Sequence, residues 1–363
     1  MTTETLNISE AQLVEYSQAH NEPSWLTDLR KEALKLTETL EMPRPDKTKI
    51  KRWDFDSFQQ LETTGGAYET LEEFPDSIKR IIDVDRSENL VIQHNNSTAF
   101  TRLSESAKND GVIVEGLAEA LVNHPDLVKK YLMTEAVNVD EHRITALHTA
   151  LINGGLFVYV PKNVVVEHPI QYVVLHDDEK ASFFNHVIIA TEESAEVTYV
   201  ENYLSNSEGN DNQVNIISEV IAGANSNITY GSVDYLDEGF TSHIIRRGHA
   251  EADASINWAL GLMNNGSQII DNTTNLIGDR STSELKSVVV GTGSQKVNLT
   301  SKIVQYGQET DGYILKHGVM RENASTVFNG VGHIKHGGTK SIANQESRVL
   351  MLSEKARGDA NPI

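Results

Sequence analysis

The chain has 363 residues, of which 39% are hydrophobic and 23% charged, so it can bury a core and is not a disordered polymer. Its net charge of −21 argues against nucleic acid or an anionic membrane surface as the main partner. It has no cysteine, which excludes disulfides, thiolate nucleophiles and cysteine-ligated zinc or iron–sulfur clusters within these residues.

No targeting or membrane-spanning segment is predicted. The segment Met1–Glu10 is polar and lacks the apolar centre of a secretory signal. No run of 18 apolar residues occurs, so no transmembrane helix is expected. These features indicate a cytoplasmic protein.

The chain opens with a predicted helical region. Ser9 and Gln12 have the spacing of a capping box, which predicts a short helix to about His20. A second helix follows Pro23 and ends at the prolines after Met42. Its apolar stripe is Leu26, Leu29, Ala33, Leu36 and Leu40.

Residues 46–153 give a mixed pattern. We expect a short helix over 75–82, a strand over 89–94, and two helical segments over 111–132 that break at His124-Pro125. A further helix is predicted over 143–153, because Ile144, Leu147, Leu151 and Ile152 share one side. The domain division that follows is a mostly helical region over 1–140 and a β core over 141–363.

The composition changes near residue 151. Four of the 24 glycines precede it and twenty follow it. No proline occurs between Pro169 and Pro362, which suits uninterrupted strand pairing because proline cannot donate to a sheet ladder. The glycines suit tight corners between strands.

Two series of apolar–polar alternation recur along this half, and they predict stacked coils. The centres Val197, Ile228, Ile256, Leu285 and Ile314 are 31, 28, 29 and 29 residues apart. A second series, 28, 25, 28 and 30 apart, is Ile216, Ile244, Ile269, Val297 and Val327. Two half-buried strands per ~29 residues favour a mainly β fold, a parallel β-helix whose first coil is 157–160 and 164–166. Helices can cover its first edge.

No known catalytic motif fits the sequence. Gly332–Ser341 superficially resembles a phosphate loop, but glycine follows Gly337 where lysine is needed. A nucleophile elbow and a His-Glu-x-x-His helix are missing. We therefore predict no catalytic residue. Catalytic carboxylates on stacked coils have no fixed sequence spacing, so a carbohydrate-active β-helix enzyme stays an alternative.

Histidines and arginines are the remaining candidates for chemistry. His317, His333 and His336 cluster in the last coils, and the last two converge only if a turn intervenes. They are weak candidates for a metal pair, against solvated turn histidines. Arg246 and Arg247 should point to opposite faces of a strand, and one should pair with an acidic residue of the next coil.

The order and spacing of several segments resemble the SufB/SufD family of iron–sulfur cluster assembly scaffolds, and its SufD branch in particular. The segments are Glu22-Pro23-x-Trp25-Leu26, Asn123-His124-Pro125, Ala146-Leu147-x-x-Ala150, Gly155 to Lys162, Val166-Glu167-x-Pro169-Ile170 and Gln345-x-Ser347-Arg348. The absence of cysteine is similar to SufD, since SufB-type chains carry the cluster cysteine.

The resemblance implies a right-handed parallel β-helix between helical regions and a scaffold without catalytic activity of its own. It implies pairing with a SufB-like subunit through the β-helix and with a SufC-like ABC ATPase through C-terminal helices. An iron–sulfur cluster would form transiently on the complex, with no cofactor held by this chain alone.

Family members continue beyond Asp359 and Pro362 into a C-terminal helical domain that docks the ATPase. That region has no counterpart here, so a partial chain is expected. The third hypothesis is a homo-oligomeric structural protein, with a homodimer formed through the β-helix edge near Ile363.

Overall fold

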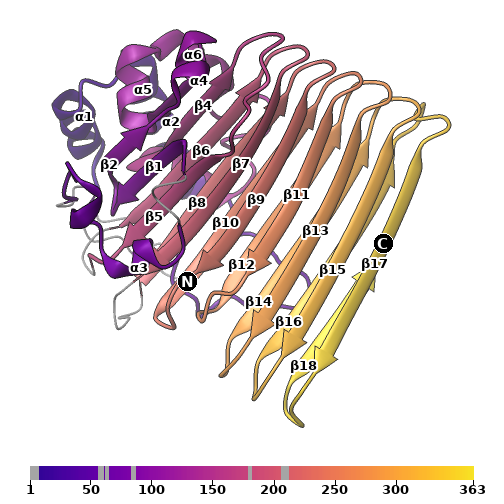
Figure 1. Ribbon diagram of the computed structural model, residues 1–363. Helices are drawn as coiled ribbons and strands as arrows, with labels where there is room; N and C mark the ends of the chain where they lie inside the picture. The colour runs from indigo at the N-terminus through magenta and orange to yellow at the C-terminus, as the bar shows by residue number, and fades with distance from the viewer. Residues whose placement is uncertain (1–7, 56–60, 62–64, 83–86, 179–181, 206–211) are drawn as a thin grey trace.

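Figure 1 shows the computed structural model, which describes residues 8–55, 61, 65–82, 87–178, 182–205 and 212–363. The first seven residues of the segment Met1–Glu10 lie outside these ranges. The first part of the chain contains α1 (Glu10–Ala19), α2 (Ser24–Thr39), the 3-10 turn η1 (Leu71–Glu73), α3 (Asp76–Lys79), β1 (Asn89–His94), β2 (Ser97–Arg102), α4 (Glu105–Asn109), β3 (Ile113–Gly116), α5 (Leu117–Asn123), α6 (Pro125–Tyr131) and α7 (Arg143–Leu151).

In the described residues after α7, the regular elements are all strands. They are β4 (Gly154–Val160), β5 (Ile170–His176), β6 (Phe183–Thr191), β7 (Glu196–Ser205), β8 (Asn212–Ala222), β9 (Asn227–Tyr235), β10 (Phe240–Ala250), β11 (Ser255–Leu262), β12 (Gln268–Leu276), β13 (Thr282–Gly291), β14 (Lys296–Gln305), β15 (Asp311–Met320), β16 (Ser325–Ile334), β17 (Ile342–Met351) and β18 (Arg357–Pro362).

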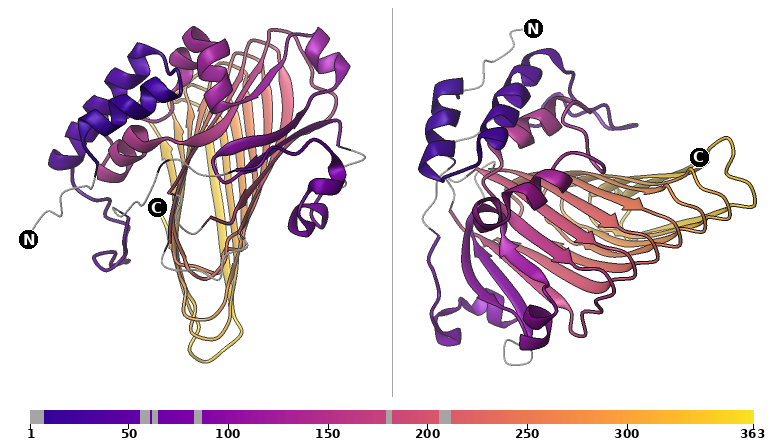
Figure 2. Two further views of the ribbon diagram at one scale, coloured as in Figure 1. Left: turned by 90° about the vertical axis from the view of Figure 1, so that its left-hand side faces the viewer. Right: turned by 90° about the horizontal axis from the view of Figure 1, so that it is seen from above.

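The strands alternate between two nine-stranded sheets, which makes the fold a β-solenoid. Sheet I has the order β17-β15-β13-β11-β9-β7-β5-β1-β2, and sheet II has β18-β16-β14-β12-β10-β8-β6-β4-β3. Pairing is parallel except at the first edges, where β2 and β3 run antiparallel to β1 and β4. Figure 2 shows the sheets face to face, with the N-terminal helices gathered at the first coils.

The predicted repeat is confirmed by the pairing register. Val197 pairs with Ile228, and Ile228 pairs with Ile256, at the predicted spacings of 31 and 28. In sheet II, Ile216 pairs with Ile244. Because neighbouring coils place like side chains above each other, each coil covers the apolar face of the next.

Several members of the predicted series are out of register. Ile244 pairs with Ile270, so Ile269 faces outward from sheet II. Val327 likewise faces outward, while its neighbour Phe328 lies in the interior cluster. In sheet I, Leu285 pairs with Trp258 instead of Ile256, a shift of two residues that keeps Leu285 on the inner face. The coils differ in corner length, and a shift of one residue turns a side chain to the other face.

The helical predictions hold in part. The capping box at Ser9 and Gln12 is present at the start of α1. In α2 the buried residues are Leu26, Arg30, Ala33 and Thr37, so the expected stripe is confirmed at Leu26 and Ala33, whereas Leu29 and Leu36 are only partly buried. Arg30 and Thr37 are buried although they are polar, so a pattern of apolar residues does not identify them. Within the described residues, no helix combines the length and apolarity needed to cross a membrane.

Two further expectations were wrong in detail. The segment 164–166 was expected as a strand but forms only an isolated bridge between Val165 and Glu196. The first residues of 111–132 form β3 instead of a helix, because they pair with β4. The break at His124-Pro125 is confirmed, with Pro125 in the first turn of α6.

The corners on one side of the solenoid share a left-handed residue. Asn163, Ser194, Asn225, Asp253, Arg280, Glu309 and Lys340 all have φ between 56° and 63°. Glycine was predicted at tight corners, but at these seven positions other residues adopt the left-handed conformation. All seven side chains are polar. Asparagine and aspartate tolerate this conformation because their side chains form local hydrogen bonds. The corner therefore repeats in geometry while its residue changes.

Three layers of packing hold the molecule together. The apolar interior between the sheets is one continuous cluster that runs from Val91 to Ala356. Residues from α2, α5 and α6 pack against the outer face of sheet II at β4, β6, β8 and β10. A strap, residues 41–55, then follows that face, where Asn298 donates to the carbonyl of Asp46 at 2.8 Å.

Candidate functional site

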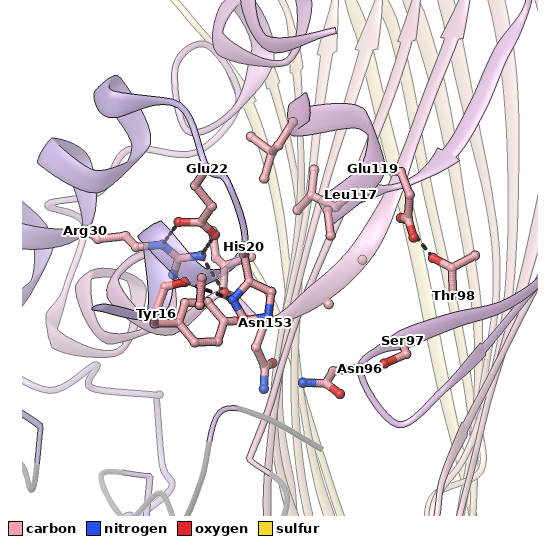
Figure 3. A pocket seen from close by; sticks show the side chains of 16 residues that line it. Tyr16, His20, Glu22, Arg30, Asn96, Ser97, Thr98, Leu117, Glu119 and Asn153 are labelled. Atoms are coloured by element: carbon pink, nitrogen blue, oxygen red, sulfur yellow. Dashed lines mark hydrogen bonds and ion pairs between the residues drawn. The ribbon is translucent and has the colours of Figure 1, made fainter. Parts of the chain in front are cut away.

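A polar pocket of about 420 Å³ lies where the N-terminal helices meet the first coils. Figure 3 shows its wall, which comes from α1, α2, the β1–β2 turn, α5 and the start of β4. The labelled side chains are Tyr16, His20, Glu22, Arg30, Asn96, Ser97, Thr98, Leu117, Glu119 and Asn153.

Arg30 in this wall fastens helices to each other. Its Nε and Nη2 donate to the Glu22 carboxylate at 2.8 and 2.6 Å. Its Nη1 and Nη2 donate to the carbonyls of Ala150 and Ile152 at 2.9 and 2.8 Å. Carbonyls at the C-terminal end of a helix, such as these at the end of α7, lack a partner within the helix. Burial opposes the charge on Arg30, but Glu22 outweighs it and raises the pKa of the guanidinium. The cation is thus used within the fold.

The rest of the wall offers hydrogen-bonding groups without a second buried charge pair. Asn153 donates to the carbonyls of Leu61 and Ser182, and its Oδ1 accepts from the amide of Phe184. The hydroxyl of Thr98 donates to Glu119 at 3.1 Å. Such a wall suits a small polar group.

A second polar cluster lies inside the solenoid, between the two sheets. Arg246 donates from Nη2 to Glu201 at 3.1 Å and to Asp234 at 2.9 Å, and all three side chains are fully buried. Three tyrosine hydroxyls also donate to Glu201, from Tyr199, Tyr203 and Tyr230. Burial raises the pKa of Glu201, which Arg246 partly offsets.

A third cluster joins the helical region to the outer face of sheet II. Nε2 of His148 lies 3.0 Å from Nδ1 of His186, whose Nε2 lies 2.9 Å from Oε1 of Glu219. The Glu219 carboxylate also accepts from the backbone amides of Met133 and Val137, at 2.7 and 3.1 Å. Burial lowers the pKa of His148 well below its ordinary value, and His186 adds to the effect.

The prediction for Arg246 and Arg247 is confirmed. Arg246 points into the solenoid, whereas Arg247 points outward and pairs with Asp271 of the next coil at 2.8 Å and with Glu141 at 2.9 Å. Arg246 has two carboxylate partners, Glu201 and Asp234, both on sheet I.

The predicted histidines lie on the surface of the last coils. His333 is exposed on β16 and His336 is exposed in the turn that follows. His317 lies 3.7 Å from Glu346. The described residues contain no group of three or more histidines and carboxylates that could hold a metal ion. A metal pair at His333 and His336 stays a prediction.

Sequence reasoning missed Glu201, Asp234 and Glu219. The signal was present for the first, because Val197, Tyr199 and Glu201 have the same parity in the strand and therefore share its inner face. Glu219 alternates with inward-facing Ser218 and Val220, so it points to the outer face. Only the packing of the 133–137 segment there shows why a carboxylate occupies that position.

Two family models together match most of the chain. Residues 173–363 match the model described as the SufBD core domain of the SUF system for FeS cluster assembly. Residues 13–172 match the model of the SufBD protein N-terminal region. The boundary between the models lies within the solenoid, in β5.

Curated relatives agree with the family models. The chain is 50% identical over 360 residues to the iron–sulfur cluster assembly protein SufD of Bacillus subtilis, covering 99% of this chain and 82% of that protein. It is 22% identical to SufBD family proteins of Staphylococcus epidermidis and Staphylococcus aureus, covering 98% and 96% of this chain and 78% and 76% of theirs. The chain therefore belongs to the SufB/SufD family of iron–sulfur cluster assembly proteins.

Proposed function

We propose that this chain is a SufD-type scaffold subunit that acts in the cytoplasm without catalytic turnover of its own. The observation that carries the proposal is 50% identity to a SufD over nearly the whole chain. The scaffold would pair with a SufB-like subunit and, through it or directly, with a SufC-like ABC ATPase.

The lack of cysteine supports a paired scaffold. These 363 residues offer no thiolate, the ligand that most iron–sulfur clusters need. A cluster assembled on the complex would therefore take its thiolates from outside these residues, and these residues would supply a rigid surface.

The outer face of sheet I supplies a candidate surface for that subunit. Val233, Gly261 and Val288 lie side by side across β9, β11 and β13. Val233 and Val288 are 38% and 43% exposed, and nearby Tyr235 is 51% exposed. On sheet II, by contrast, helices and the strap cover much of the corresponding face. A flat apolar row on a rigid sheet fits the core of a protein–protein interface.

A pull-down with purified subunits tests the proposal. The tagged chain should retain a SufB-like subunit, and ATP hydrolysis should appear only when the SufC-like subunit is added. Val288→Glu should reduce recovery of the SufB-like subunit several-fold, whereas Val165→Glu, at a 60% exposed valine outside this row, should not. ATP hydrolysis by the chain alone would contradict the scaffold role. Equal recovery with both variants would contradict the surface.

A further inference from the structure

The register places a row of polar side chains along the solenoid interior. On the inner face of sheet I, Ser232, Leu260, Ser287 and Lys316 pair in succession. On the inner face of sheet II, Arg246, Asn272, Ser301 and Gly330 pair in succession. Each residue of the first row belongs to the same coil as one residue of the second.

Contacts between the sheets show that the two rows meet. At one end, Nη2 of Arg246 donates to the hydroxyl of Ser232 at 2.8 Å. At the other end, the position that a Cβ on Gly330 would occupy lies 2.9 Å from Nζ of Lys316 and closer still to Oε1 of Gln345. A glycine there leaves room for the ammonium group to reach sheet II. Asn272, Ser287 and Ser301 lie between these ends; with Arg246 and Lys316 they form what we call the interior file.

The interior file holds polar atoms without hydrogen-bond partners, although Lys316 and Arg246 lie over the rings of Phe328 and Tyr230. Within the described residues, no hydrogen bond reaches Nε or Nη1 of Arg246, either amide atom of Asn272, the hydroxyls of Ser287 and Ser301, or Nζ of Lys316. Arg246, Asn272, Ser301 and Lys316 are fully buried, and Ser287 is 3% exposed. Buried polar atoms in folded proteins almost always have partners, so a run of such atoms on four successive coils calls for a bound group that supplies them.

The charges of the described interior side chains cancel only when both ends of the interior file are counted. Arg246 faces two carboxylates, Glu201 and Asp234, which leaves one negative charge in excess when all three are ionised. Lys316 supplies the matching positive charge three strands beyond Asp234 and four strands beyond Glu201, which is about 14 and 19 Å at the usual strand spacing. Burial alone lowers the pKa of Lys316 to about 8, with no carboxylate beside it.

We propose that ordered water molecules fill the interior file and connect the ammonium of Lys316 with the carboxylates beside Arg246. Water fits the unpartnered atoms because it donates to the Asn272 carbonyl oxygen and accepts from the serine hydroxyls, the guanidinium and the ammonium. The chain of water provides a route by which one proton passes from Lys316 to Glu201. That step turns an ammonium and a carboxylate into a neutral amine and a carboxylic acid, with no change in total charge.

A crystal structure of the full chain at a resolution that shows ordered water tests the occupancy without any variant. Water is expected within hydrogen-bond distance of Lys316 Nζ, the Ser301 hydroxyl and the Asn272 amide. An interior without ordered solvent beside these atoms, or side chains that bond directly to one another there, would overturn the proposal.

Titration of the Lys316 amine by NMR tests the connection in solution. Glu201→Gln removes the excess negative charge and should lower the pKa of Lys316 by several tenths of a unit, whereas exposed Glu251→Gln should leave it unchanged. Asn272→Leu keeps both charged ends and fills the middle of the interior file with an apolar side chain. It should also lower that pKa, and it serves if Glu201→Gln does not fold. An unchanged Lys316 titration in a folded variant of either kind would refute the connection.

Discussion

Replacing Glu219 with glutamine should release the 133–137 segment from the solenoid. The carboxylate is fully buried and accepts three hydrogen bonds, two from the backbone amides of Met133 and Val137 and one from His186. A glutamine has the same shape but turns one oxygen into an amide donor. Even in the better orientation, the Val137 amide then faces another donor, and the other bonds lose their charged acceptor.

The expected cost follows from those contacts. Losing one charge-assisted bond and leaving one buried donor unsatisfied costs about 2–4 kcal/mol. At 1.4 kcal/mol for each factor of ten, that corresponds to about 30- to 700-fold faster exchange of the two amides. Hydrogen exchange read by mass spectrometry on peptides that contain Met133 and Val137 provides the local measurement.

A matched variant separates this local effect from the loss of any carboxylate. Glu251→Gln removes a 48% exposed carboxylate beside His249 and should change the unfolding free energy by no more than about 0.5 kcal/mol. The reasoning fails if folded Glu219→Gln protein shows the wild-type exchange rate at both amides.

Three other predictions concern buried charge. Stability should be full above about pH 6.5 and fall toward pH 4, because burial depresses the folded-state pKa of three histidines that the unfolded chain protonates near 6.5. The pKa of His142 is lowered to about 4, and those of His148 and His243 are lowered well below their ordinary value. Urea unfolding across that range gives the slope, and a flat profile would contradict it. Arg246→Met should cost about 3–5 kcal/mol, since it leaves two buried carboxylates unpaired. Arg280→Met, at a 56% exposed arginine, should leave the unfolding free energy nearly unchanged, and chemical unfolding compares the two variants. Arg30→Met should loosen α2 from α7, seen as faster proteolysis within residues 8–40, and wild-type resistance there would argue against the anchoring role.

Local sequence signals predicted the elements that depend on local chemistry. The capping box at Ser9 defined the start of α1, and the proline after His124 marked the first turn of α6. Alternation of apolar and polar residues located the strands, because a half-buried strand repeats every two residues whatever its neighbours are. The near-constant spacing of those strands then indicated a solenoid before any pairing was known.

The candidate sites depended on register, which the sequence did not define to the residue. The interval between paired residues of neighbouring coils varies from 26 for Ser242 and Gln268 to 32 for Ser325 and Arg357, because corner lengths differ. An error of one residue exchanges inner and outer faces, as Ile269 shows. The sequence by itself therefore determined a mainly β solenoid with a helical start and no thiolate. Only the tertiary structure decided that Arg246 meets Glu201 across the interior, since residues 45 positions apart come together only when both sheets close on one core.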